Sequence, residues 1–346
     1  MQQQRPPPSP ARPRPGSRAA AVLRQALAFG LLGGALFLMF HLTAEHLRAR
    51  GIRTGFDFLW QPATTPVFDS PLSFQAGVDS FAKAFAAGAL NSLKITAAAI
   101  VAATLFGLLV GLGRMSGNAL ARALCGGYVE LMRNVPVLLH IFFWYGLVLE
   151  LPAAADLAGV PGAIDGGRHW LLATNRGVHL AWFGVDDAGH WGWQWPRPDG
   201  LQISGGLSMT PEFLALFIGL SLYTAAFVAE IVRAAVEALP AGQWQAAAAL
   251  GLRRHTVLAR VILPQALRIG LPALTSEYLG LFKNSTLAVA IGYQDFMAVS
   301  NTMLTDTGQA VEVMAVVMAF YVLVSLLVSA LMHAFERRSQ RGWGRP

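Results

Sequence analysis

The sequence predicts an all-α membrane protein, a polytopic bundle of about six spans, and three observations point to that fold class. Of the 346 residues, 54% are hydrophobic and only 13% are charged, whereas soluble domains carry about 25% charged residues. Apolar runs recur along the chain at lengths close to the ~20 residues that cross a bilayer as a helix. Basic residues gather in alternate connections between these runs, as they do in multi-span membrane proteins.

The predicted spans lie at residues 26–42, 93–112, 136–151, 213–232, 271–291 and 311–335. The first run follows a basic tail rich in proline and lacks a small-residue cleavage pattern, so it is interpreted as an uncleaved span rather than a signal peptide. The tail itself, residues 1–25, has too few apolar residues to fold and is predicted to be disordered. A second basic tail follows the last span, at residues 336–346.

The distribution of lysine and arginine predicts that both termini are cytoplasmic. With the N-terminus inside, seventeen basic residues fall on the cytoplasmic side, and only seven fall outside: Arg48, Arg50, Arg53, Lys83, Arg168, Arg176 and Arg197. Basic residues near span ends are retained in the cytoplasm. The net charge of +7 is therefore explained by topology, and because the arginines are not clustered in one polar domain we expect no nucleic-acid partner.

Two long external loops are expected, at residues 43–92 and 152–211. The second loop carries Trp170, Trp182, Trp191, Trp193 and Trp195. Tryptophan favours the headgroup region of a membrane, so an aromatic belt on membrane lipid is one interpretation, and a platform on which a ligand stacks is the other. At the end of this loop, Thr210-Pro211-Glu212 has the residue types of a helix start, with an N-cap, a first-turn proline and an acid.

The cytoplasmic loop at residues 234–270 contains a predicted helix–turn–helix between Gly242 and Pro264. Its first helix, from Trp244 to Leu250, is rich in alanine, and Gly251 stands where a left-handed cap ends a helix. A second helical stretch runs to Pro264, which should kink or restart the chain. The small alanine face, with Trp244 and Leu250 as anchors, suits docking into the groove of a partner. An amphipathic helix lying on anionic headgroups fits the same residue types.

A resemblance to a known family decides between these two interpretations. The series Gln245-Ala246-Ala247, Gly251 and Leu263-Pro264 resembles the EAA loop of permease subunits of ABC importers. The match extends from about residue 91 to 335 and includes Tyr128 to Pro136, Tyr223 to Arg233, and Phe282 to Leu287. Within that family the polar amino-acid branch is the most similar, and Arg50 to Leu59 with Asn175-Arg176-Gly177 resemble the larger permease of general L-amino-acid transporters.

What this resemblance implies is a type I ABC permease domain at residues 93–335, in a multi-pass protein of a bacterial inner membrane. It implies a dimer of ATPase subunits docked on Trp244, Gln245, Ala246, Ala247, Leu250, Gly251, Leu263 and Pro264. It also implies a second permease and a periplasmic amino-acid-binding protein as partners. Two departures stand out: Gln245 replaces the usual glutamate, and the pair of spans that related permeases often carry after Gly177 is absent.

No cofactor is expected in this chain, and it is not expected to be an enzyme. The sequence has three lysines, none of them after a glycine, so it holds no phosphate-binding loop for ATP. ATP and Mg²⁺ would be used by the partner subunit. The main alternative is a secondary transporter or channel, which often shows two related halves, and a membrane enzyme is a weaker one because no catalytic motif or metal-ligand spacing is present. The amino acid carried is left open.

Several charged or polar residues fall inside the predicted spans, where they are expected to face protein or water. Glu277, Lys283, Asn284 and His140 are the candidate residues of a translocation pathway, although Lys283 could equally hold a contact with the second permease. Lys94 is expected to extend to the outer boundary. Glu230, Arg233 and Glu237 are spaced to lie on one helix face and predict an ion-pair ladder.

Overall fold

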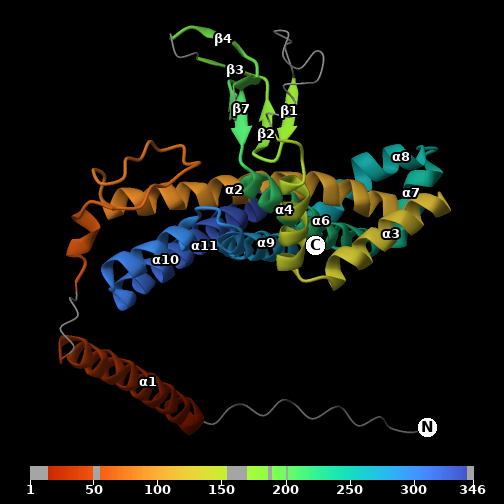
Figure 1. The fold of residues 1–346 in the computed structure, drawn as a ribbon. Coiled ribbons are helices and arrows are strands. Elements are labelled where there is room, and N and C mark those ends of the chain that lie inside the picture. The colour runs from red at the N-terminus through yellow and green to blue at the C-terminus, as the bar shows by residue number, and fades with distance from the viewer. Residues whose placement is uncertain (1–14, 50–54, 154–169, 186–188, 200–201, 341–346) are drawn as a thin grey trace. The chain divides into compact units, whose positions relative to one another are not determined.

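The computed structural model describes residues 15–49, 55–153, 170–185, 189–199 and 202–340, in two compact units divided after Phe56 (Figure 1). The first unit is built on helix α1 (Pro15–Ala49), which contains the predicted span at 26–42. Because α1 begins at Pro15, the prediction of a disordered tail is wrong from that residue onward. Residues 1–14 of the tail and 341–346 of the C-terminal tail lie outside the described residues.

The second unit is a bundle of helices. Its long members are α2 (Phe81–Arg114), α6 (Pro211–Glu237), α9 (Leu263–Asn284) and α11 (Ala310–Gln340). Shorter ones are α3 (Ala119–Asn134), α4 (Val137–Leu149) and α10 (Phe296–Thr307), with a 3₁₀ turn η1 (Asp57–Trp60) before α2. Among the described residues, four helical stretches are long and apolar enough to cross a membrane, and the bent pair α3–α4 could form a fifth span.

The α3–α4 pair replaces the simple third span predicted at residues 136–151. The two helices meet at an angle of 105°. Between them Val135 is extended, with φ −101° and ψ 131°, because the ring of Pro136 disfavours helical backbone at the preceding residue. The prediction recognised the apolar α4 but missed the amphipathic α3.

The fifth span is longer than predicted and has an unusual start. Helix continues from Arg254 to Ile291, through wide π-helical turns η2 (Leu258–Ile262) into α9 and then a 3₁₀ stretch η3 (Ser285–Ile291). Pro264 has no N–H to donate and its ring crowds the preceding turn. The wide turns lie directly before it, so the chain changes helix type there, as the expected restart at Pro264 requires.

Small residues let the central helices approach closely. A Cβ added to Gly107 of α2 would lie 2.6 Å from the Cβ of Val228 and 2.7 Å from the carbonyl oxygen of Ala225 in α6. Gly111 has the same relation to α6 one turn later, 2.9 Å from the carbonyl oxygen of Ala229. Packing of this kind holds helices together where lipid removes the hydrophobic drive between them. The α2–α6 contact is therefore the centre of the bundle.

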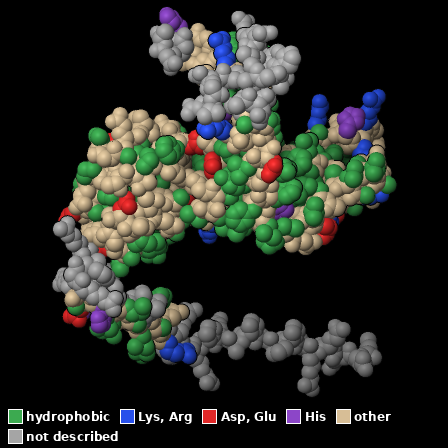
Figure 2. All heavy atoms as spheres, viewed as in Figure 1, with side chains coloured by type: hydrophobic (Ala, Val, Ile, Leu, Met, Phe, Trp, Pro, Cys, Tyr) green, Lys and Arg blue, Asp and Glu red, His purple; other side chains and the backbone are tan. Residues whose placement is uncertain are grey.

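Apolar side chains are also abundant on the outside of the bundle, as a membrane protein requires. Figure 2 shows hydrophobic side chains spread over its visible face. The most apolar stretch of α11 is only 11% buried within the chain, and Met318, Leu326 and Leu331 are each more than 60% exposed. These surfaces are left for lipid or for another subunit.

Residues 171–209 depart from the all-α prediction. They form short antiparallel strands: β1 (Leu171–Thr174), β2 (Gly177–Leu180), β3 (Trp182–Val185), β4 (Trp191–Gln194), β5 (Arg197–Asp199), β6 (Gln202–Ser204) and β7 (Leu207–Met209). The pairs are β3–β4 and β5–β6, and β1–β2–β7 is a three-stranded sheet. The strands lie within the long loop expected at residues 152–211, where alternating aromatic residues and glycine turns favour hairpins that were not predicted. Thr210 does cap α6 as predicted, accepting from the N–H of Phe213.

Candidate functional site

The predicted helix–turn–helix is present beside the ends of α2 and α6, and we call this part of the second unit the loop end. Its first helix is α7 (Ala241–Ala249) and its second begins with α8 (Arg254–Val257). Gly251 has φ +69°, the left-handed conformation predicted for it. The N–H of Leu252 donates to the carbonyl of Ala247, which closes the turn between the helices. The loop is therefore a defined structure and not a flexible linker.

One face of the loop is packed against the bundle. Ala247 is 5% exposed and belongs to a cluster with Ala235, Val236, Ile262 and Ala266, on which Trp244 packs half-buried. Trp244 and Ala247 thus hold α7 against the bundle, and their contact with a partner stays a prediction. They fix α7 to the end of α6 and the beginning of α9.

The opposite face is open. Gln245, Ala246 and Gly251 are exposed, and Leu250 is 78% exposed. Pro264 is exposed and Leu263 half-buried at the beginning of α9. A large leucine beside a strip of alanines can enter an apolar groove with little loss of side-chain entropy on the alanine side. Of the predicted docking residues, Leu250 is the side chain best placed as an anchor.

An ion-pair cluster ties this end of the bundle together. Arg233 pairs with Glu230 and Glu237, the ladder predicted from their spacing. The carboxylate of Glu230 also accepts from Arg114 at the end of α2. Sequence reasoning missed Arg114, because a partner on another helix leaves no spacing signal. The pair of Arg114 and Glu230 therefore joins the end of α2 to α6 beside the loop.

A second candidate region contains two of the predicted pathway residues, His140 and Glu277. His140 is buried, its ring centroid 5.9 Å from that of Tyr223, and Tyr223 lies 5.0 Å from Phe227. The guanidinium of Arg133 lies over the Phe227 ring at 5.2 Å. Glu277 of α9 is within electrostatic range of both Tyr223 and Arg133. The structure thus groups His140 and Glu277 and adds Arg133, which sequence reasoning did not single out.

Lys283 and Asn284 lie at the C-terminal end of α9, further along the helix than Glu277. Lys283 is exposed and Asn284 half-buried, whereas Glu277 is half-buried, so Lys283 and Glu277 differ in their surroundings. Lys94 has partners within the chain: its Nζ donates to the carbonyl oxygen of Asp69 at 2.5 Å and lies over the ring of Phe213. Lys94 fastens the segment before α2 to the start of α6.

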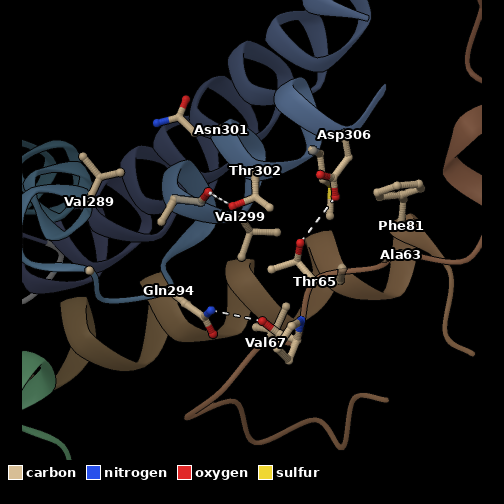
Figure 3. A pocket seen from close by; sticks show the side chains of 15 residues that line it. Ala63, Thr65, Val67, Phe81, Val289, Gln294, Val299, Asn301, Thr302 and Asp306 are labelled. Carbon is tan, nitrogen blue, oxygen red and sulfur yellow. Dashed lines mark hydrogen bonds between the residues drawn. The ribbon is translucent and has the colours of Figure 1, made fainter. Parts of the chain in front are cut away.

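At the other end of α2 lies a cavity of about 280 Å³ that the sequence did not predict, and we call this part of the unit the α10 end (Figure 3). Its walls come from residues 63–67, from α2 at Phe81 and Ala84, and from α10. Asp306 lies at its rim, where its carboxylate accepts from the hydroxyl of Thr65 at 3.4 Å and from that of Thr64 at 2.9 Å. The cavity is mostly apolar with one carboxylate.

Close to this cavity, Asp295 is a fully buried acid between two spans. One carboxylate oxygen caps α10 by accepting from the N–H of Ala298 at 2.8 Å, and its Oδ2 has no hydrogen-bond partner. Burial raises the pKa of Asp295 to about 7, against the opposing effect of the N–H groups at the start of α10. The hydroxyls of Tyr293 and Tyr321 are buried without a partner as well.

Comparison with known proteins gives consistent matches. A family model described as "Binding-protein-dependent transport system inner membrane component" matches residues 103–341. The chain is 38% identical to the putative amino-acid ABC transporter permease protein YhdX of Escherichia coli (strain K12), over 92% of this chain and 93% of the relative. It is 34% identical to the general L-amino acid transport system permease protein AapQ of Rhizobium johnstonii, over 92% of each chain.

A solved structure shows the same fold. A chain from the crystal structure of an amino acid ABC transporter with histidines superposes with a TM-score of 0.53 and 24% identity, covering 75% of this chain and 95% of that chain. A chain of the inward-facing methionine ABC transporter MetNI superposes with a TM-score of 0.51 and 16% identity. At these identities the likeness concerns the fold alone.

Proposed function

Because the chain belongs to the family of binding-protein-dependent transport system inner membrane components, we propose that it is one permease half of an ATP-driven importer of L-amino acids. The family comprises membrane-embedded, multi-pass transport subunits and not enzymes. The names of its relatives YhdX and AapQ support amino acids as the transported class. In this proposal the protein lies in a bacterial inner membrane, α1 is the sixth span, and both termini are cytoplasmic.

The loop end is then the cytoplasmic end and receives an ATPase subunit. Leu250 and the exposed alanines beside Gln245 enter the ATPase, and Trp244 and Ala247 transmit its movement because they pack on the ends of α6 and α9. The wide helical turns before Pro264 are the weakest part of this connection. ATP and Mg²⁺ are bound by the ATPase dimer, and closure of that dimer moves the bundle between two states.

The group around His140, Tyr223 and Glu277 provides a path for a zwitterion. An amino acid carries an ammonium and a carboxylate, and Glu277 and Arg133 offer the opposite charges on two different helices, with Tyr223 between them in electrostatic range of Glu277. His140 and Asn284 add hydrogen-bonding groups along the same bundle. Lys283, exposed on α9, meets the second permease in this proposal. At the α10 end an external amino-acid-binding protein delivers the substrate.

The observation that carries the proposal is the exposed helix–turn–helix anchored by Trp244, in a chain with no ATP-binding loop of its own. Its test is uptake of labelled L-amino acids by proteoliposomes that hold this chain with the second permease, the ATPase and the binding protein of the proposed complex. We expect uptake only when ATP is enclosed in the vesicles, on the same side of the membrane as the ATPase. Uptake that continues without ATP under a proton gradient would instead identify a secondary transporter.

A further inference from the structure

The hairpin formed by β3 and β4 has one face made entirely of apolar side chains. Phe183 is paired with Trp193, and Val185 with Trp191, so these four side chains share a face of the two-stranded ribbon. All four are exposed, Trp191 by 72%. The other face carries the pairs Trp182–Gln194 and Gly184–Gly192. The two faces therefore differ: the first has four apolar side chains, and the second has one tryptophan, one glutamine and two glycines.

Trp170 enlarges this face into an aromatic cluster. Its ring centroid lies 5.5 Å from that of Trp193, and Trp170 is itself 64% exposed. Phe183 contacts both Trp191 and Trp193, at 6.1 Å and 5.8 Å between centroids. We call Trp170, Phe183, Val185, Trp191 and Trp193 the aromatic face. Contiguous apolar patches of this kind mark a surface that is covered by a partner or by a membrane.

The strands are rooted where two apolar helices end. The N–H of Asn175 donates to the carbonyl of Pro152, just after α4, and α6 begins at Pro211, directly after β7. Figure 1 shows β1, β2 and β7 projecting from the helices beside α4. The strands therefore stand where α4 ends and α6 begins, at one end of two apolar helices.

A groove beside the aromatic face adds a positive charge. It measures about 550 Å³ and is lined by Trp193, Trp195, Arg197 and the turn at Gly205 and Gly206. Arg197 is exposed, and a guanidinium binds phosphate through two parallel hydrogen bonds. Indole rings next to such a group are the combination found at the headgroup level of membranes, where an apolar body meets a polar tip.

From these observations we propose that the aromatic face and Arg197 bind phospholipid, with the aromatic face at the boundary of headgroups and acyl chains and Arg197 on a headgroup phosphate. The positive charge of the groove and the exposed tryptophans favour a lipid surface over a protein partner. The hairpins then act as an anchor that holds the start of α6 at the membrane boundary, on the side opposite the loop end.

Site-directed spin labelling in proteoliposomes of phosphatidylethanolamine and phosphatidylglycerol tests this proposal directly. The sequence has one cysteine, so Cys125→Ser provides the background for single labels at Val185→Cys, on the aromatic face, and Gly192→Cys, on the other. A Cβ at Gly192 meets nothing within 4 Å, so that site tolerates the change. We expect the label at 185 to collide often with oxygen and rarely with a water-soluble nickel complex, and the label at 192 to show the reverse.

Two results would overturn the proposal. Equal access of the nickel complex to both labels would place the aromatic face in water, and exclusion of both reagents from position 185 would show that protein covers it. The groove is tested by Arg197→Gln, which should move the label at 185 toward water. Arg176→Gln, an arginine that does not line the groove, is the matched control, and an equal shift in both variants would remove the role of Arg197. An unchanged thermal unfolding temperature confirms that each variant is folded.

Discussion

The loop end and the α10 end of the bundle differ in how far along the chain their contacts reach. At the loop end, α7 is held by residues of the neighbouring helices α6 and α9, close to it in sequence. At the α10 end, Asn91 donates to the carbonyl of Gln294 and the N–H of Phe296 donates to Ser92, contacts between residues about two hundred positions apart. The helix–turn–helix of the first end is a local motif, to which Met115 and the Arg114–Glu230 pair add contacts from α2, and the second end is a junction of distant segments.

This difference corresponds to two mechanical roles. A local motif with one exposed face can move with a partner while its own structure is kept, as a coupling element must. A junction that joins α2 to residues 63–69 and to α10 holds one arrangement until several hydrogen bonds break together. We therefore expect substitutions at the loop end to change coupling, and substitutions at the α10 end to change stability.

The largest expected effect is at the centre, where both ends depend on the α2–α6 contact. In Gly107→Val the new side chain would meet Val228 and the carbonyl of Ala225 at less than 3 Å. Overpacking of this type costs about 1–3 kcal/mol, or more where backbone must move. We expect a clear fall in the unfolding temperature of the purified protein. Gly146→Val is the matched control, because a Cβ there meets nothing within 4 Å; equal stability of the two variants would contradict close packing at Gly107.

A smaller effect, confined to the α10 end, is expected from Asp295→Asn. Burial raises the pKa of Asp295 from 3.8 to about 7 in the folded protein. The folded state therefore binds the proton more tightly than the unfolded state, so the contribution of this group to stability is full below pH 3.8 and is lost as the pH rises through about 7. Asparagine keeps the cap on α10 and carries no charge.

Thermal unfolding measured across this pH range checks the prediction. The wild type should lose stability between about pH 4 and about pH 7, and the Asn variant should lose less and be the more stable protein at higher pH. The groups that face Asp295 are Ser92 from α2, Tyr293 beside it and Tyr321 from α11. If Asp295→Asn has the same pH profile as the wild type, ionisation of Asp295 does not lower the stability of the folded protein, and the prediction is contradicted.

The smallest effect is expected from Gln245→Glu at the loop end. Gln245 is exposed, and a carboxylate there stays hydrated and forms no new buried pair. If the shape of the loop carries docking, ATP hydrolysis coupled to transport should change by no more than about twofold, since rim charges contribute little to affinity. A large change in either direction would mean that charge at this position matters in the interface.

The same contrast explains what the sequence predicts and what it cannot. Features set by local chemistry were predicted correctly: the Thr210 cap, the left-handed Gly251 and the pairs of Arg233 on its own helix. Features set by distant segments were not, such as Arg114 on Glu230 or the burial of Asp295. A pattern along the chain contains no information on which remote residue pairs with or covers a given side chain.

The predicted limits of helices and strands were wrong for a related reason. Helix α2 begins at Phe81 rather than at residue 93, because the polar Asn91, which precedes the predicted run, finds partners inside the protein. The strands after α4 were missed since each has only three or four residues, too few for a periodic signal. The helix–turn–helix was predicted correctly, but the packing of Trp244 and Ala247 on the bundle was not.

The central claim is that the loop end docks an ATPase through its exposed face, and Leu250→Asp tests it most directly. Leu250 is 78% exposed and supports no contact of the bundle core, so the variant should fold. Val78→Asp, at a residue 72% exposed before α2, is the matched control. We predict that the ATPase subunit co-purifies with the wild type and with Val78→Asp, and is lost from Leu250→Asp. Retention of the ATPase at the wild-type level in Leu250→Asp would contradict the account.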